Sequence, residues 1–188
     1  DFIGLFKRPG TTILVDPAMA DDGKMYPVFT KNFAAEMARL CAKANIIVPN
    51  MTEAAFLLGE DYVPAPYRRD YIEHLLEGLL KLGCTSAVLT GVDLGDGRLG
   101  TASAQQGAGK ISFAFSQKVP GYYHGTGDIF ASALLAACLN GHALADAAQL
   151  AADYTCECIV RTKQAGTDVR FGVNFEAGLA DFARAVMK

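Results

Sequence analysis

Short apolar runs alternate along the chain with longer segments in which apolar residues recur every three or four positions. Runs of strand length, rich in β-branched residues, predict buried strands over residues 11–15, 45–48 and 86–89. The helical spacing between them predicts helices over residues 30–44, 51–58 and 68–82. This succession is typical of an α/β domain in which helices cover both faces of a mostly parallel sheet.

The pattern changes after the third predicted strand. Ile111, Phe113 and Phe115 alternate with serine and alanine, and glycine-rich turn signals flank this segment and the one before it. We expect an antiparallel meander at the sheet edge, over residues 99–105 and 111–117. The rest of the chain predicts helices over residues 127–139, 143–161 and 174–187.

Composition fits a single domain over residues 1–188. Hydrophobic residues make up 51% of the chain, which is enough for a substantial core. The formal net charge is −3 and no basic cluster occurs, so neither nucleic acid nor a membrane is expected as a partner. The longest uncharged stretch, residues 129–145, is interrupted by Asn140-Gly141, a pair typical of a helix end. The five cysteines, an odd number, favour a reducing cytoplasm.

Polar residues end or follow each of the three predicted parallel strands. Asp16 follows the first strand, Asn50 follows the second, and Thr90 follows the third. Because ligands of open α/β sheets bind beyond the carboxyl ends of the strands, these positions predict a binding site. The nearby residues 21–24 (DDGK) also fit a plain surface turn, although an unpaired acid such as Asp16 is unusual at the end of a buried strand.

The segment GYYHGTGDIFASALL places a lone carboxylate, Asp128, at the start of an apolar helix. The first N–H groups of a helix have no intrahelical partners and carry the positive end of the helix dipole. Gly125, Thr126 and Gly127 could therefore wrap a phosphate, with Asp128 placed to accept a proton from an attacking hydroxyl. The competing interpretation is that Thr126 or Asp128 only caps a core helix.

The segment PNMTE also has two interpretations. Asn50 followed three residues later by Glu53 has the spacing of a capping box, which on its own explains the pattern well. The functional interpretation is that both residues hold a hydrated Mg²⁺ near nucleotide phosphates.

Three segments in this order, DPAMADDGKMY, VPNMTEAAFLLG and GYYHGTGDIFASALL, resemble pyridoxal kinases of the ribokinase-like superfamily. The resemblance covers most of the chain. It implies a three-layer ribokinase-like α/β fold and phosphorylation of the 5′-hydroxymethyl group of pyridoxal, pyridoxine or pyridoxamine. It further implies ATP and Mg²⁺ as cofactors, with a monovalent cation such as K⁺ possible, a B6 vitamer as the small-molecule substrate, and a homodimer.

The resemblance also implies a role for each matching residue. Asp128 corresponds to the general base, and Gly125, Thr126 and Gly127 to the anion hole. The remaining positions implied for the nucleotide and its metal are Asp21 and Glu53 for Mg²⁺, and Asp21, Tyr26, Asn50, Thr90, Val119 and Tyr123 for ATP. The chain departs from the family where Gly91 follows Thr90, since a serine is frequent there, so one phosphate-facing hydroxyl is lost.

The family's chains carry a further N-terminal part that supplies most contacts to the pyridine ring. The 188 residues are therefore expected to be the C-terminal, nucleotide-binding and catalytic portion of such a kinase, with the N-terminal portion missing. Three alternatives remain open: a hydroxymethylpyrimidine kinase of the same superfamily, a sugar or nucleoside kinase, and a non-catalytic nucleotide-binding module.

Overall fold

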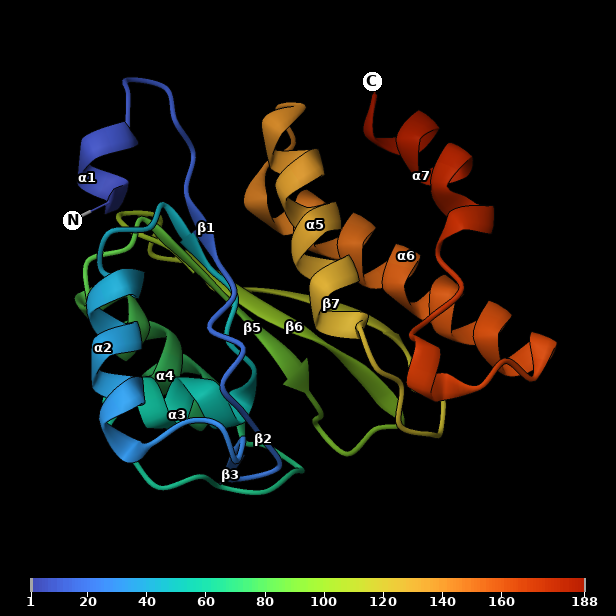
Figure 1. Ribbon diagram of the computed structural model, residues 1–188, viewed down its shortest axis with the longest axis horizontal. Coiled ribbons are helices and arrows are strands. Elements are labelled where there is room, and N and C mark those ends of the chain that lie inside the picture. Colours follow the sequence, from blue (N-terminus) through green and yellow to red (C-terminus); the bar gives the residue numbers. More distant parts are fainter. Residues whose placement is uncertain (1, 188) are drawn as a thin grey trace.

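The computed structural model describes residues 2–187, so the ends of the expected domain, Asp1 and Lys188, lie outside the described residues. A five-stranded sheet in the order β1-β4-β5-β6-β7 forms its centre (Figure 1). The strands are β1 (Leu14–Val15), β4 (Ile46–Ile47), β5 (Ser86–Val92), β6 (Arg98–Gln105) and β7 (Ser112–Gln117). β1, β4 and β5 pair in parallel, whereas β6 is antiparallel to both β5 and β7. All strands except β6 thus run in one direction, which confirms the mostly parallel sheet and its antiparallel edge.

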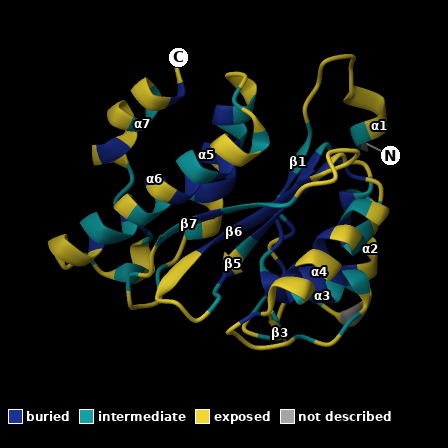
Figure 2. Ribbon diagram, turned by 180° about the vertical axis from the view of Figure 1, so that it is seen from behind, coloured by how far each residue is buried: buried dark blue, intermediate teal, exposed yellow. Residues whose placement is uncertain are grey.

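Helices cover both faces of this sheet (Figure 1). One face carries α2 (Lys31–Cys41), α3 (Met51–Leu58) and α4 (Arg69–Lys81). The other carries α5 (Thr126–Leu139), α6 (Leu144–Ala165) and α7 (Leu179–Val186). Neighbouring residues of β5 pack on opposite faces of the sheet. Leu89 belongs to the core under α2, α3 and α4, and Val88 belongs to the core under α5, α6 and α7. The strands between the layers are mostly buried (Figure 2), and the expected three-layer architecture is confirmed.

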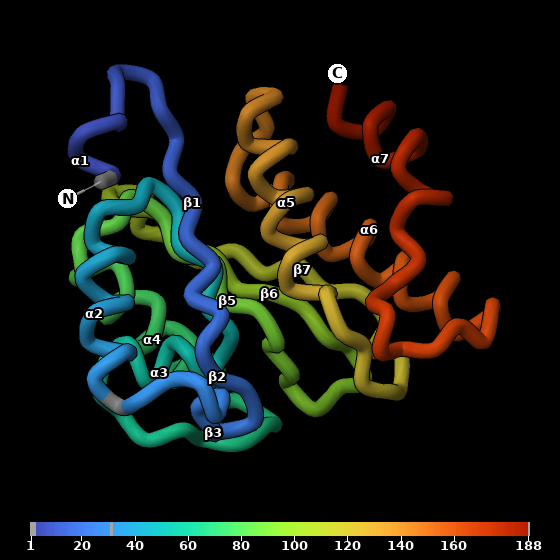
Figure 3. Tube along the Cα trace, viewed as in Figure 1, coloured from blue at the N-terminus to red at the C-terminus, as the bar shows by residue number. Residues whose placement is uncertain are grey.

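The remaining elements lie around the sheet (Figure 3). They are the short helix α1 (Phe2–Phe6), the hairpin strands β2 (Ala20–Asp21) and β3 (Lys24–Met25), and the 3₁₀ turns η1 (Val169–Phe171) and η2 (Glu176–Gly178). Over residues 2–187, no helix is both long and apolar enough to cross a membrane.

Several boundaries differ from those expected, and three of the differences change the local structure. The surface turn at residues 21–24 is a β-hairpin, because Asp22 and Gly23 both adopt positive φ (50° and 74°), as the two central residues of a type I′ turn do. The third strand continues beyond Leu89 to Val92, because β6 pairs with this extension across a bulge. The single helix expected over residues 174–187 is η2 followed by the shorter α7.

Candidate active site

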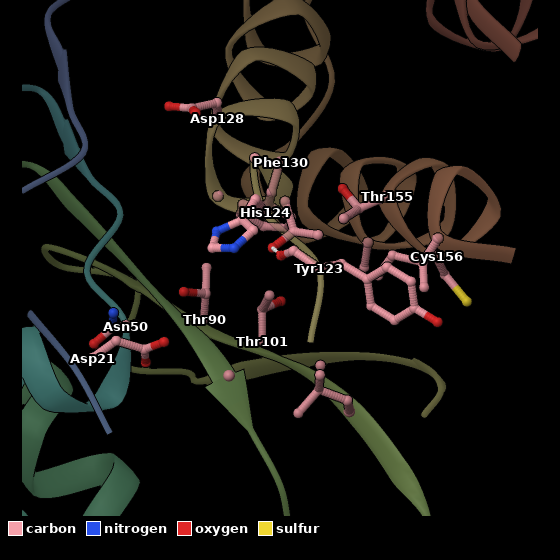
Figure 4. A pocket seen from close by; sticks show the side chains of 18 of the residues that line it. Asp21, Asn50, Thr90, Thr101, Tyr123, His124, Asp128, Phe130, Thr155 and Cys156 are labelled. Atoms are coloured by element: carbon pink, nitrogen blue, oxygen red, sulfur yellow. Dashed lines mark hydrogen bonds between the residues drawn. The ribbon is translucent and has the colours of Figure 1, made fainter. Parts of the chain in front are cut away.

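A pocket of about 480 Å³ lies at the carboxyl ends of β1, β4 and β5 and continues between β6, β7 and α6 (Figure 4). All residues that the sequence assigned to the site line this pocket: Asp21, Tyr26, Asn50, Glu53, Thr90, Val119, Tyr123, Gly125, Thr126, Gly127 and Asp128. They come from segments far apart in the chain, which the strand order brings to one edge of the sheet. The structure therefore brings the predicted residues together, and their individual roles stay predictions.

The N-terminus of α5 opens into this pocket without a cap. Gly125, the N-cap residue, has a φ of 77°, a left-handed conformation that glycine adopts without strain. No side chain caps the helix, because the Thr126 hydroxyl donates back to the Tyr123 carbonyl oxygen (3.4 Å) instead. The interpretation of Thr126 or Asp128 as a cap is therefore wrong. The first N–H groups of α5 remain available to an anion.

Asp128 lies in the first turn of α5 with its side chain exposed to solvent. In Figure 4 its side chain extends away from the helix. Asp16 lies nearby, since its Oδ2 atom is 3.7 Å from the position that a Cβ atom on Gly127 would take. Burial raises the pKa of Asp16, and the negative charge of Asp128 raises it further. The end of β1 and the start of α5 therefore bring two carboxyl groups to one side of the pocket. The sequence singled out Asp16 without assigning it a role.

Asn50 and Glu53 form a complete capping box at the start of α3. The Asn50 Oδ1 atom accepts the Glu53 N–H, and the Glu53 Oε2 atom accepts the Asn50 N–H, each at 2.8 Å. The same side chains also hold the segment leading into the hairpin. Glu53 Oε1 accepts the Met19 N–H (3.0 Å), and Asn50 Nδ2 donates to the Ala20 carbonyl oxygen (2.8 Å). This network fixes the backbone immediately before Asp21.

Glu53 is only 3% exposed, and both of its carboxylate oxygens accept backbone N–H groups. Burial raises its pKa to about 7, although these hydrogen bonds oppose the shift. Its oxygens are thus occupied, which makes Glu53 a poor direct metal ligand in this geometry. Its observed hydrogen bonds instead hold the backbone of Met19 and Asn50 at the edge of the pocket.

Asp21 fits a hydrated magnesium ion better. One oxygen of its half-buried carboxylate accepts the Asp22 N–H (3.0 Å), and burial raises its pKa. No cluster of three or more His, Cys, Asp or Glu side chains suited to a metal occurs in the part of the chain that the structure describes. Mg²⁺ needs no such cluster, because it commonly keeps several waters and binds one or two carboxylates together with substrate phosphates.

Thr90 lies where the part of the pocket at the carboxyl ends of the parallel strands meets the part between β6, β7 and α6. It lies within β5, forms a parallel bridge with Asn50, and donates its N–H to the Pro49 carbonyl oxygen (3.0 Å). Beyond it, Tyr123 lies on the side where α6 contributes Thr155 and Cys156, and Val119 also lines the pocket. The residues from β6, β7 and α6 that line this side could not be singled out beforehand, because short polar residues there look like ordinary strand and helix positions.

Comparison with known protein families gives one decisive match. The model of the phosphomethylpyrimidine kinase family matches residues 4–172. The chain belongs to this family. Comparison with curated proteins gave no match.

Similar solved structures include both kinds of kinase. A provisionally named phosphomethylpyrimidine kinase from Bacteroides thetaiotaomicron has a TM-score of 0.92 and 28% identity, covering 97% of this chain and 63% of that one. Pyridoxal kinase from Lactobacillus plantarum has a TM-score of 0.84 and 30% identity, covering 93% and 62%. Pyridoxal kinase from Staphylococcus aureus in complex with ADP, at 20% identity and a TM-score of 0.68, covers 80% and 53% and supports the fold alone.

These similarities confirm the ribokinase-like fold. The chain spans less than two thirds of the length of each of these structures. The family match does not separate pyridoxal kinases from phosphomethylpyrimidine kinases, because both occur among the similar structures.

Proposed function

We propose that this protein transfers the γ-phosphoryl group of Mg·ATP to the hydroxymethyl group of a small heteroaromatic ring, with B6 vitamers as the acceptors. The observation that carries this proposal is the uncapped N-terminus of α5, which presents the exposed Asp128 to the pocket that Asp21 and Thr90 also line. Phosphoryl transfer requires mainly positioning and charge stabilisation from a protein, and this arrangement offers both.

In this mechanism, Asp128 accepts the proton of the attacking hydroxyl group. Its exposed carboxylate lies in the first turn of α5, close to the backbone N–H groups of the anion site. Those groups would stabilise the charge that develops on the transferred phosphoryl group. A base and an anion site held on one helix keep a constant mutual geometry, which is what positioned catalysis requires.

The residues of the pocket fit a magnesium ion that is held largely by the nucleotide. Asp21 would bind it together with the phosphates, while Asn50 and Glu53 hold the backbone before Asp21 in place. The ion would supply charge neutralisation between the phosphates. The dependence on K⁺ and the homodimer remain expectations from the resemblance.

The choice of B6 vitamers rests on the segment DPAMADDGKMY and on the similarity to pyridoxal kinase from Lactobacillus plantarum. The Bacteroides structure has also been determined in a form with pyridoxal. Hydroxymethylpyrimidine is the second candidate acceptor, and the match to the phosphomethylpyrimidine kinase family favours it.

The test is a phosphoryl-transfer assay with Mg·ATP and either pyridoxal or hydroxymethylpyrimidine as the acceptor. We expect 5′-phosphate formation from pyridoxal with the higher kcat/KM. A preference for hydroxymethylpyrimidine would replace the acceptor and keep the mechanism. ATP binding without transfer to either acceptor would instead identify a non-catalytic nucleotide-binding module.

A further inference from the structure

Thr101, in the middle of the antiparallel part of the sheet, carries a buried hydroxyl group without a partner. Its side chain is 4% exposed. Among the side chains that the structure describes, Thr101 Oγ1 and the Tyr71 hydroxyl are the buried oxygens or nitrogens that lack a hydrogen bond. Burying a hydroxyl without a partner costs free energy, so such a group calls for an explanation.

The position of Thr101 offers an explanation for this unpaired hydroxyl, because the residue lines the pocket described above. In the β5–β6 ladder, Ala102 pairs with Leu89 and Gly100 pairs with Val92, with a bulge between them. Thr101 is therefore next to the part of β5 that contains Thr90. Figure 4 shows the two threonine side chains rising from neighbouring strands into the same space.

Three other hydroxyl groups of the pocket already have partners within the protein. Thr155 donates to the Ala151 carbonyl oxygen (2.8 Å), and Ser116 donates to the Asp153 carboxylate (2.8 Å). Thr126 donates to the Tyr123 carbonyl oxygen (3.4 Å). Thr101 differs from these three residues because its hydroxyl is buried and has no partner within the folded chain.

We propose that Thr101 Oγ1 donates a hydrogen bond to the bound nucleotide, at the point where its phosphate chain meets the sugar. This inference rests on the proposed function. Thr101 lies between the predicted phosphate contacts, Thr90 and the start of α5, and the opposite side of the pocket, where α6 contributes Thr155. The acceptor is an oxygen of the α-phosphate or of the ribose, and both offer the same chemistry to a hydroxyl donor.

The test compares Thr101→Val, which removes the hydroxyl and keeps the shape, with Thr101→Ser, which keeps the hydroxyl. Calorimetric titration should show an ATP Kd about tenfold higher for Thr101→Val, the effect expected for one hydrogen bond to a charged or polar ligand. Thr101→Ser should bind within about threefold of the unsubstituted protein, because its donor remains. The unfolding midpoint of Thr101→Val should stay equal or rise, because the valine buries no unpaired oxygen.

Ser103→Ala is the matched control, because Ser103 lies two positions farther along β6, is equally buried and does not line the pocket. Its ATP affinity should change less than about twofold. Titrations with AMP and adenosine locate the acceptor. A loss seen with AMP and absent with adenosine assigns the α-phosphate, whereas a loss seen with both assigns the ribose.

Equal ATP affinity of the unsubstituted protein and Thr101→Val would overturn the inference. An equal loss in Ser103→Ala would do the same, since it would mean that any change in this part of β6 weakens binding. If the unsubstituted protein transfers phosphate but Thr101→Val binds ATP normally, only the role of Thr101 fails. If the unsubstituted protein binds no nucleotide, the proposed function fails together with it.

Discussion

Two helix N-termini face the same pocket, and they are built in opposite ways. At α3, the side chains of Asn50 and Glu53 accept two backbone N–H groups at the start of the helix and hold the segment before the hairpin as well. At α5, the N-cap is Gly125 and no side chain satisfies the first turn. A capped helix end stabilises the fold, whereas an uncapped one retains its capacity to bind an anion.

The two carboxylates in these first turns differ in the same way. Glu53 is buried and its oxygens are occupied by backbone N–H groups, while Asp128 is exposed to solvent. A side-chain cap on α5 would stabilise the protein by about 1 kcal/mol. A side-chain cap stabilises α3 but is missing at α5. This difference is expected if α3 maintains the shape of the pocket and α5 contacts the ligand.

Substitution of Asp128 is the most severe test of this contrast. Asp128→Asn keeps the size of the side chain but removes the proton acceptor, so kcat should fall at least about a hundredfold. Because the side chain is exposed, the free energy of unfolding should change by less than about 0.5 kcal/mol. The affinity for ATP should stay unchanged. Steady-state kinetics, urea denaturation and ATP titration measure the three quantities.

Asp146→Asn provides the control, because Asp146 is also an exposed acid in the first turn of a helix, α6, and does not line the pocket. Its kcat should match that of the unsubstituted protein. If Asp128→Asn retained near-normal turnover, the acid in the uncapped helix would not be the base, and the contrast between the two helices would lose its functional meaning.

Glu53 should instead affect stability, in a way that depends on pH. Burial raises its pKa from 4.5 to about 7, so the folded protein keeps a proton that the unfolded chain releases between these values. The stabilising contribution is complete below pH 4.5 and is lost as the pH rises through about 7. The free energy of unfolding should therefore fall across this window by up to about 3 kcal/mol.

Glu53→Gln does not titrate, so its stability should decrease less between pH 4.5 and 8 than that of the unsubstituted protein. Urea denaturation at several pH values measures this difference. Asp16 and Asp21, whose pKa values burial also raises, are present in both proteins, so the difference between the profiles reports Glu53 together with its charge interaction with Asp16. Glu36→Gln, at an exposed glutamate of α2, should leave the profile unchanged. Parallel profiles for Glu53→Gln and the unsubstituted protein would show that Glu53 is ionised throughout.

The order of strands and helices could be predicted from the sequence, because long segments such as α4 and α6 carry a clear hydrophobic period. The hairpin of β2 and β3 could not, since two-residue strands are too short to show alternation. The 3₁₀ turn that leads directly into α7 also involves tertiary contact, because the Arg161 guanidinium occupies the space where a Cβ on Gly178 would lie.

The site was partly predictable for a similar reason. Polar residues at strand ends, such as Asn50 and Thr90, can be read from the pattern of strands alone. The role of Glu53 could not be decided, because its third hydrogen bond comes from the Met19 N–H, thirty-four positions away along the chain. The unpartnered hydroxyl of Thr101 gave no signal either, since a lack of partners becomes visible only once the surrounding side chains are placed.

Substitution of Gly127 should have the smallest effect, but it separates two quantities, because stability and activity should change in opposite directions. A Cβ atom at this position would lie 3.7 Å from Asp16 Oδ2, an ordinary contact, so the folded protein has room for alanine. Since alanine favours a helix more than glycine does, Gly127→Ala should stabilise the protein by up to about 1 kcal/mol.

The same methyl group would project beside the open N–H groups of α5, where the phosphoryl group is proposed to lie, so kcat should fall about tenfold. Gly125→Ala is the informative companion. The positive φ of Gly125 should make alanine destabilising there by about 1–2 kcal/mol, so this variant loses activity together with stability. A Gly127→Ala protein that is both more stable and fully active would mean that nothing approaches the first turn of α5 closely. The missing cap would then have no functional reason, and the two helix ends would differ in stability alone.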